Sequence, residues 1–288
     1  MKKKLIAGLL VGAMVVSLSG CGSSKTEEAP AASAAGDSAA EETAEAEPVT
    51  LNVFAAASMT ETLTEIQEMY KDVAPNVTLV FNFDSSGTLK TQIQEGADCD
   101  LFISAAQKQM NQLDKDADPE VNTEGLDYVL EGTRVNLLEN KVVLAVPDGN
   151  PKDIESFEDL GTDRLSLLAL GNEDVPVGQY SIEILTNLGI LDSLEAEGKI
   201  TYGSNVKEVT TQVSEAAADA GIIYATDAFS AGLTVVDQAE GDLCKQVIYP
   251  AAVLNISRNP EAAKEFLAYL QTDTCMQVFE AVGFTAAE

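Results

Sequence analysis

The sequence predicts an α/β fold in which helices cover two mostly parallel sheets. Strand-like apolar runs alternate with segments whose apolar residues recur at helical spacing, and a turn-rich stretch at 147–151 separates two such sets. The chain has 288 residues, which is enough for one large or two medium domains. We therefore expect two α/β units, each with its own sheet.

The first twenty residues predict a signal peptide rather than part of the fold. Lys2, Lys3 and Lys4 precede an apolar run at 5–18, which is shorter than the ~20 residues that span a bilayer as a helix. The run exits through Leu-Ser-Gly-Cys, which resembles the bacterial lipoprotein processing site and implies a lipid on Cys21. Ordinary secretion with an unmodified Cys21 is the alternative.

Residues 21–48 predict an acidic linker rich in alanine, glutamate and serine. From residue 22 onward this segment has no aromatic and no branched aliphatic side chain, so it cannot bury enough apolar surface to fold. We expect an extended, solvated tether. The folded body would then be exported and anchored to the outer face of the cell membrane, with the lipid as its membrane contact.

The first α/β unit begins directly after the linker. Its expected elements are a strand at 50–56, a helix at 59–70, a strand at 77–83, a helix at 89–96 and a strand at 100–104. In the first helix, Leu63, Ile66 and Met69 recur at helical spacing. This order predicts parallel strands, because a parallel pair needs a crossover connection that is usually a helix.

The second unit repeats the alternation. Its expected elements are strands at 166–169, 200–202 and 220–224 with helices at 178–188 and 206–217, and the chain closes with helices at 261–270 and 274–282. Strands at 141–146 and 247–254 are expected to connect the units, one leading out and one returning. That predicts lobe I from 49–139 and 254–288 and lobe II from 140–253, with a ligand cleft between them.

The composition excludes several classes of function. The chain has no histidine, so it cannot build Ser-His-Asp, Cys-His or HExxH chemistry, and we expect neither an enzyme nor a metal site. Its 47 acidic against 17 basic residues, a net charge of −30, argue against binding to nucleic acid or to an anionic membrane surface. Cys99, Cys244 and Cys275 are too far apart in sequence for a metal motif and are expected to be small buried hydrophobes.

Four strand-to-helix junctions carry the candidate site. They lie at 55–61, 84–89, 174–180 and 203–208. Ser58 and Glu61 have the spacing of a capping box, and Gly87 allows close approach of the backbone at the second junction. Helix amino ends present unpaired N–H groups and a partial positive charge, so several of them around one cleft would bind a small anion without a basic side chain. Simple helix capping is the alternative at each junction taken alone.

Six short runs resemble, in order, the molybdate-binding proteins of ABC importers. They lie at 53–58 (VFAAAS), 85–89 (SSGTL), 100–105 (DLFISA), 175–178 (VPVG), 221–228 (GIIYATDA) and 283–285 (GFT). The resemblance implies a two-lobed type II periplasmic-binding-protein fold that closes on molybdate or tungstate and hands the oxyanion to an ABC transporter permease. It also implies a monomer with no cofactor, whose molybdenum is bound as an oxyanion and not by direct protein ligation.

The resemblance also implies which residues hold the oxyanion. Carried over position by position, these are the hydroxyl and N–H groups of Ser58 and Ser86, the N–H groups of Val177 and Val206, and the phenol of Tyr224. Val177 stands where the family usually has a small residue such as alanine, which keeps a backbone donor but brings a larger side chain. Asp84 adds a negative charge directly before the serine run.

Other ligands and other classes of protein remain open at this point. The same fold could bind another small anion such as sulfate or an organic acid, although a carboxylate usually recruits an arginine and none of the four junctions contains one. An exported hydrolase lacks a paired nucleophile and base in this sequence. An adhesive or structural lipoprotein would show no response to a small ligand.

Overall fold

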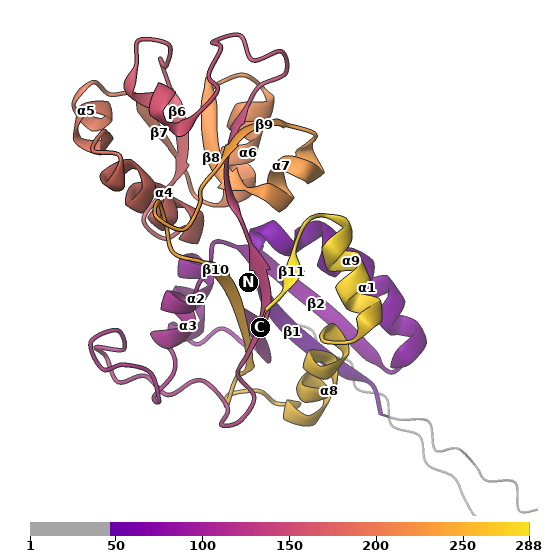
Figure 1. Ribbon diagram of the computed structural model, residues 1–288. Coiled ribbons are helices and arrows are strands. Elements are labelled where there is room, and N and C mark those ends of the chain that lie inside the picture. Colours follow the sequence, from indigo (N-terminus) through magenta and orange to yellow (C-terminus); the bar gives the residue numbers. More distant parts are fainter. Residues whose placement is uncertain (1–46, 288) are drawn as a thin grey trace, which may run out of the picture. The chain divides into compact units, whose positions relative to one another are not determined.

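The computed structural model describes residues 47–287 of the chain (Figure 1). The expected signal peptide, Cys21 and nearly all of the expected linker lie outside the described residues. Within 47–287 there is no helix long and apolar enough to cross a membrane.

The first sheet has six strands in the order β11-β4-β10-β3-β1-β2. These are β1 (Val49–Ala56), β2 (Val77–Asp84), β3 (Leu101–Ile103), β4 (Val135–Asn140), β10 (Val247–Val253) and β11 (Thr285–Ala286). Its helices are α1 (Thr60–Val73), α2 (Ser86–Gln94), α3 (Gln107–Asn111), α8 (Pro260–Leu270) and α9 (Asp273–Ala281). In Figure 1, α1, α8 and α9 gather on one side of this sheet and α2 and α3 on the other.

The second sheet has five strands in the order β7-β6-β8-β5-β9. These are β5 (Val142–Val146), β6 (Leu168–Gly171), β7 (Ile200–Gly203), β8 (Ala220–Tyr224) and β9 (Thr234–Gln238). Its helices are α4 (Pro176–Asn187), α5 (Leu191–Ala196), α6 (Val206–Ser214) and α7 (Ala225–Ala231). Two short 3-10 helices complete the described part of the chain: η1 (Ala57–Met59) follows β1 of the first sheet, and η2 (Phe157–Gly161) follows β5 of the second. Every residue of β5 and β8 is buried, as expected for strands covered on both faces.

Both sheets are mixed, which corrects the expectation of mostly parallel sheets. β1 pairs in parallel with β2 and β3, and β6 pairs in parallel with β7 and β8. β10 and β4 in the first sheet and β5 and β9 in the second pair antiparallel. β5 and β10 enter their sheets directly from the other sheet. No crossover helix therefore imposes a parallel direction on either strand.

The connections between the sheets also differ from expectation. The predicted outgoing strand at 141–146 is β5, but it continues from β4, whose polar Asn136, Glu139 and Asn140 hid it from the apolar pattern. The predicted returning strand at 247–254 is β10, which pairs with β3 and β4 and, within residues 47–287, with no strand of the second sheet. Residues 247–253 therefore lie in the sheet of the expected lobe I, and the chain returns through 239–246.

The cysteines of the described part are free thiols. Cys99 and Cys275 are buried as expected, with the pKa of the Cys99 thiol raised above its usual range by burial, and Cys244 is half-buried. Cys99 and Cys275 belong to the hydrophobic cores, and Cys244 packs against one of them.

Candidate functional site

A small cavity lies where elements of the two sheets meet. Its volume is about 10 Å³, and its lining residues are Ala56, Ala57, Ser58, Asp84, Ser85, Ser86, Ala105, Val175, Pro176, Val206 and Tyr224. These residues come from the ends of β1, β2 and β8, from the starts of η1, α2, α4 and α6, and from the connection after β3. The structure thus brings all four predicted junctions to one place, together with Ser58, Ser86, Val206 and Tyr224.

Ser58 is held by a polar network instead of capping α1. Its Oγ lies 2.8 Å from Tyr249 Oη, and Asn140 Nδ2 donates to the same Tyr249 oxygen at 3.2 Å. Asn140 also donates to Thr226 Oγ1 at 2.9 Å. With Asn140 as donor to Tyr249, the Tyr249 hydroxyl can donate to Ser58, which leaves the Ser58 proton for the cavity. The capping-box expectation is wrong, because α1 has Met59 at its N-cap position and no side-chain cap.

Ser86 is prepared as a donor in the same way. It is fully buried, and its Oγ accepts a hydrogen bond from the Ala105 N–H at 2.9 Å. The hydroxyl proton of Ser86 is therefore available to a ligand. Its neighbour Ser85 is the N-cap of α2 and accepts from the Thr88 N–H at 3.1 Å, so capping by a hydroxyl is confirmed at this junction.

The second sheet contributes backbone donors from two helix starts. Pro176 is the first residue of α4 and has no N–H, so Val177 supplies that helix's first amide donor. Val206 is the first residue of α6, which Asn205 caps by accepting from the Glu208 N–H at 3.1 Å. Within residues 47–287, no hydrogen bond uses the N–H groups of Ser58, Ser86, Val177 or Val206. The Val177 side chain is buried and lies outside the cavity lining, next to Pro176.

Tyr224 ends β8 and lies at the N-cap position of α7. It is buried, and its ring meets Tyr249 edge to face at a centroid distance of 5.8 Å. Its hydroxyl donates to the Ala105 carbonyl oxygen at 3.4 Å, which is longer than a strong O–H···O bond, so a better acceptor can replace that partner. Burial raises the pKa of Tyr224 well above its usual value, and the phenol stays a donor near neutral pH.

Asp84 lines the cavity and does not simply face solvent. Its Oδ1 accepts from the Ser85 N–H at 2.7 Å and lies 3.5 Å from Asn205 Nδ2, a contact that joins the two sheets' elements. These donors compensate part of its charge. The lining holds no lysine, arginine or other basic side chain, so positive potential for an anion must come from amide dipoles and hydroxyl protons.

A known family matches this chain. The model of the bacterial extracellular solute-binding protein family matches residues 51–285. The chain belongs to this family. The expected type II fold agrees, since solved periplasmic binding proteins share it: a molybdate-binding protein of Azotobacter vinelandii superposes with a TM-score of 0.72 at 22% identity, covering 83% of this chain and 100% of that one.

Two further relatives of this solute-binding protein are more similar in sequence. The molybdate-binding protein ModA of Escherichia coli (strain K12) is 36% identical over 242 residues, which cover 82% of this chain and 88% of that one. A Bacillus subtilis (strain 168) protein, YvgL, is 38% identical over 240 residues, covering 83% and 87%, and its name provisionally describes an ABC transporter substrate-binding lipoprotein.

The sequence patterns did not identify the residues that hold the cavity's two serine hydroxyls in place by hydrogen bonds in this solute-binding protein. Tyr249, Asn140 and Ala105 were not among the residues expected to form the site. Tyr249 and Asn140 lie on strands that pair only in the folded sheet, so no local motif marks them. The Ala105 N–H stands 19 residues from the serine it contacts. The nearest sequence signal was the run at 100–105, which ends on Ala105.

Proposed function

We propose that this solute-binding protein captures molybdate or tungstate and delivers it to an ABC transporter permease without catalysis. One observation carries the proposal: hydroxyl and amide donors from the starts of η1, α2 and α6, with the Tyr224 phenol from the end of β8, converge on one cavity that has no basic side chain and lies beside the start of α4. Relatives named for molybdate binding, such as the Escherichia coli protein, align over most of the chain and support the choice of ligand.

A cavity built from donors selects an oxyanion that carries no proton. Ser86 accepts a hydrogen bond from the Ala105 N–H, and Ser58 can accept one from the Tyr249 hydroxyl, so both serine protons are available to a ligand. Hydrogen phosphate needs an acceptor for its O–H, and Asp84, the one carboxylate among the lining residues, already accepts from the Ser85 N–H. A buried O–H that Asp84 did not accept would cost about 1–3 kcal/mol. Sulfate has the same charge in a smaller frame, so its rejection must depend on hydrogen bonds that become too long.

Binding requires the two sheets to move apart and close again. The cavity, about 10 Å³ in volume, is lined by residues of both sheets, so a ligand enters when the sheets part and is enclosed when they meet. We take each sheet with its helices as one lobe. The expected division is kept except that Asn140 and residues 247–253 move to lobe I, which gives 49–140 and 247–288 for lobe I and 141–246 for lobe II.

The surroundings of the protein are proposed from its amino-terminal sequence. A signal peptide at 1–20, lipidation of Cys21 and the acidic linker at 21–48 would anchor a monomeric body to the outer face of the membrane. The provisional name of the Bacillus subtilis relative, a substrate-binding lipoprotein, supports this arrangement.

Calorimetric titration tests the function directly. The chain, purified without residues 1–20 and stripped of ligand by unfolding and refolding, would be titrated with molybdate, tungstate, sulfate and phosphate. We expect tight one-to-one binding of the first two and no heat of binding from the others. Tight binding of sulfate alone would instead favour the same fold adapted to a smaller anion. If none of the four anions bound, the four junctions would be ordinary capped helix starts and not an anion site.

A further inference from the structure

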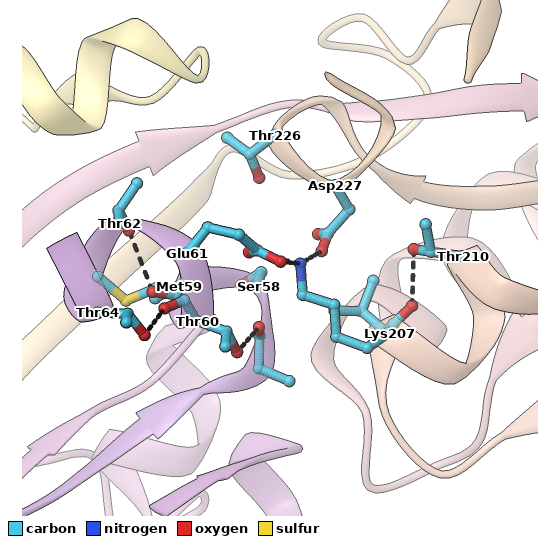
Figure 2. Close-up of polar contacts among 12 residues, drawn as sticks. Ser58, Met59, Thr60, Glu61, Thr62, Thr64, Lys207, Thr210, Thr226 and Asp227 are labelled. Carbon is cyan, nitrogen blue, oxygen red and sulfur yellow. Dashed lines mark hydrogen bonds and ion pairs between the residues drawn. The ribbon is translucent and has the colours of Figure 1, made fainter. Parts of the chain in front are cut away.

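Lys207 joins the two halves of the candidate site. It is the second residue of α6, directly after the amide donor Val206, and its Nζ lies 2.7 Å from Glu61 Oε2 and 3.1 Å from Asp227 Oδ1. Glu61 belongs to α1 of the first sheet, and Asp227 belongs to α7 of the second. Figure 2 shows the ammonium group between the two carboxylates, with Ser58 nearby on the Glu61 side.

This ion pair differs from the others in the described part of the chain. Of the ion pairs within residues 47–287, Lys207–Glu61 is the one that joins an element of one sheet to an element of the other. The comparison pair Lys71–Glu68 lies within α1 and is well exposed, at 60% and 65% of the side-chain surface. Its loss would not affect how the halves meet.

Asp227 fixes Lys207 from the second sheet. Its side chain is fully buried, and within the described residues no donor besides Lys207 reaches either carboxylate oxygen. A buried carboxylate needs a compensating charge, so Lys207 is held against α7 whether or not Glu61 is near. Glu61 is half-exposed. It is therefore the partner that can arrive and leave as the halves close and open.

The two charged residues sit next to ligand donors. Lys207 follows Val206 by one residue, and Glu61 follows Ser58 by three. Because consecutive Cα atoms are only 3.8 Å apart, a bond between the side chains limits how far the Val206 amide and Ser58 can separate. Neither Lys207 nor Glu61 lines the cavity, so both act through the donors beside them.

We propose that Lys207 is a positioning residue that clasps Glu61 across the cleft and holds the donors of α6 and η1 at the spacing that a bound oxyanion requires. The proposal rests on the proposed function, because it assigns the clasp to closure around that anion. A half-exposed ion pair of this kind changes an equilibrium by about two- to fivefold. The clasp therefore tunes affinity and residence time, and the donors themselves provide recognition.

Glu61→Gln tests the clasp with little risk to folding. It keeps the shape of the side chain, leaves the buried Lys207–Asp227 pair intact and removes the charge that crosses the cleft. Lys71→Met is the matched control, since it breaks an exposed pair on the same helix. The double variant Glu61→Gln with Lys207→Met measures the coupling between the two side chains. Melting temperatures without ligand identify any variant that has lost stability.

Two readouts decide the outcome. In titration with molybdate, we expect Glu61→Gln to raise Kd about two- to fivefold through faster dissociation, with Lys71→Met unchanged and the double variant no weaker than Lys207→Met alone. In hydrogen exchange without ligand, we expect faster exchange of the Gly87 amide, whose hydrogen bond to the Asp174 carbonyl oxygen joins the two sheets, in Glu61→Gln only. Unchanged Kd and unchanged exchange would overturn the clasp. A wild-type chain that binds no oxyanion would overturn the proposed function. The exchange measurement would then still test whether the Lys207–Glu61 contact holds the two halves together.

Discussion

The Gly87 N–H donates a hydrogen bond to the carbonyl oxygen of Asp174 at 3.0 Å. Gly87 lies in the first turn of α2 beside Ser86, and Asp174 lies just before α4, so the bond joins the two sheets at the edge of the cavity. A Cβ at position 87 would lie 2.8 Å from the Asp174 Cα and closer still to its carbonyl oxygen. The approach of these two backbones therefore requires glycine.

Gly87→Ala should weaken oxyanion binding without weakening the fold. Alanine favours a helix over glycine by about 1 kcal/mol, so α2 itself gains from the change. Closing the halves against the added methyl would cost about 1–3 kcal/mol, or about 5- to 150-fold in Kd. Titration with molybdate measures the loss, and thermal melting without ligand checks the fold.

Gly241→Ala is the control for that substitution. Nothing lies within 4 Å of a Cβ at position 241, and the residue does not require a positive φ. It should leave both Kd and melting temperature unchanged. An unaltered Kd in Gly87→Ala would mean that the Gly87–Asp174 contact does not belong to the ligand-bound form.

Removing either serine hydroxyl should reduce affinity strongly. In Ser58→Ala and Ser86→Ala, one hydrogen bond to a charged ligand is lost, which is worth about 1.5–3 kcal/mol, or about 10- to 150-fold in Kd. Ser86→Ala also leaves the buried Ala105 N–H without its acceptor, so it should lower the free energy of unfolding as well. Calorimetric titration and urea unfolding separate the two effects.

The exposed Ser193→Ala serves as the matched control for the serines. Its hydroxyl donates to Glu197 on the surface of α5, away from the cavity. It should bind molybdate like the wild type. If Ser58→Ala and Ser86→Ala behaved like Ser193→Ala, the polar network behind the cavity would be structural and would not prepare donors for a ligand.

The periodicity of the sequence predicted the helix-connected strands best. β1, β2 and β8 match their expected ranges within one residue. β1 and β8 are largely buried and have nearly continuous apolar runs, and the edge strand β2 is rich in β-branched and aromatic residues. β4 was missed since its asparagines and glutamate interrupt such a run. α7 was missed because Ala-Thr-Asp-Ala-Phe-Ser-Ala has no apolar stripe at helical spacing.

The site was predictable only as far as its local motifs extend. Helix starts and glycine can be identified from neighbouring residues, so the junctions of Ser86 and Val206 were found. The Ser58–Tyr249 bond joins residues 191 positions apart, and the Lys207–Glu61 bond joins residues 146 positions apart. Such pairs depend on how sheets and lobes meet, which periodicity does not encode. The false capping box at Ser58 has the same cause, since Tyr249 and Lys207 engage its two members.

Protonation of Asp227 should make stability depend on pH. Burial raises the pKa of this carboxyl to about 6 from an ordinary 3.8, against the opposing effect of Lys207 and with a smaller rise from Glu61. The buried tyrosines Tyr224 and Tyr249 also face it but stay neutral in this range. Between about pH 4 and 6 the folded protein binds a proton that the unfolded chain has released. The free energy of unfolding should therefore fall as pH rises through this window.

Asp227→Asn should abolish that dependence. Asparagine cannot ionise, so urea unfolding from pH 4 to 7.5 should show the wild type losing about 3 kcal/mol relative to the variant as Asp227 ionises. Asp98→Asn makes the same charge change at an exposed carboxylate and should follow the wild-type profile. Parallel profiles for wild type and Asp227→Asn would contradict the assignment.

Added salt should accelerate capture of the oxyanion. The chain carries a net charge of −30, of which −27 falls on residues 49–288, so a dianion approaches against a repulsive field. Between about 0.01 and 0.1 M ionic strength the screening length falls from about 30 to 10 Å, which removes repulsion at a distance but spares the short contacts with Ser58 and Ser86. The association rate should thus rise while the dissociation rate changes little.

Stopped-flow measurements can follow tyrosine emission, because Tyr224 lines the cavity and the chain has no tryptophan. The same increase with sodium and lithium chloride would identify screening as the cause. A rate that fell with ionic strength would instead reveal attraction by a local positive field strong enough to overcome the net charge.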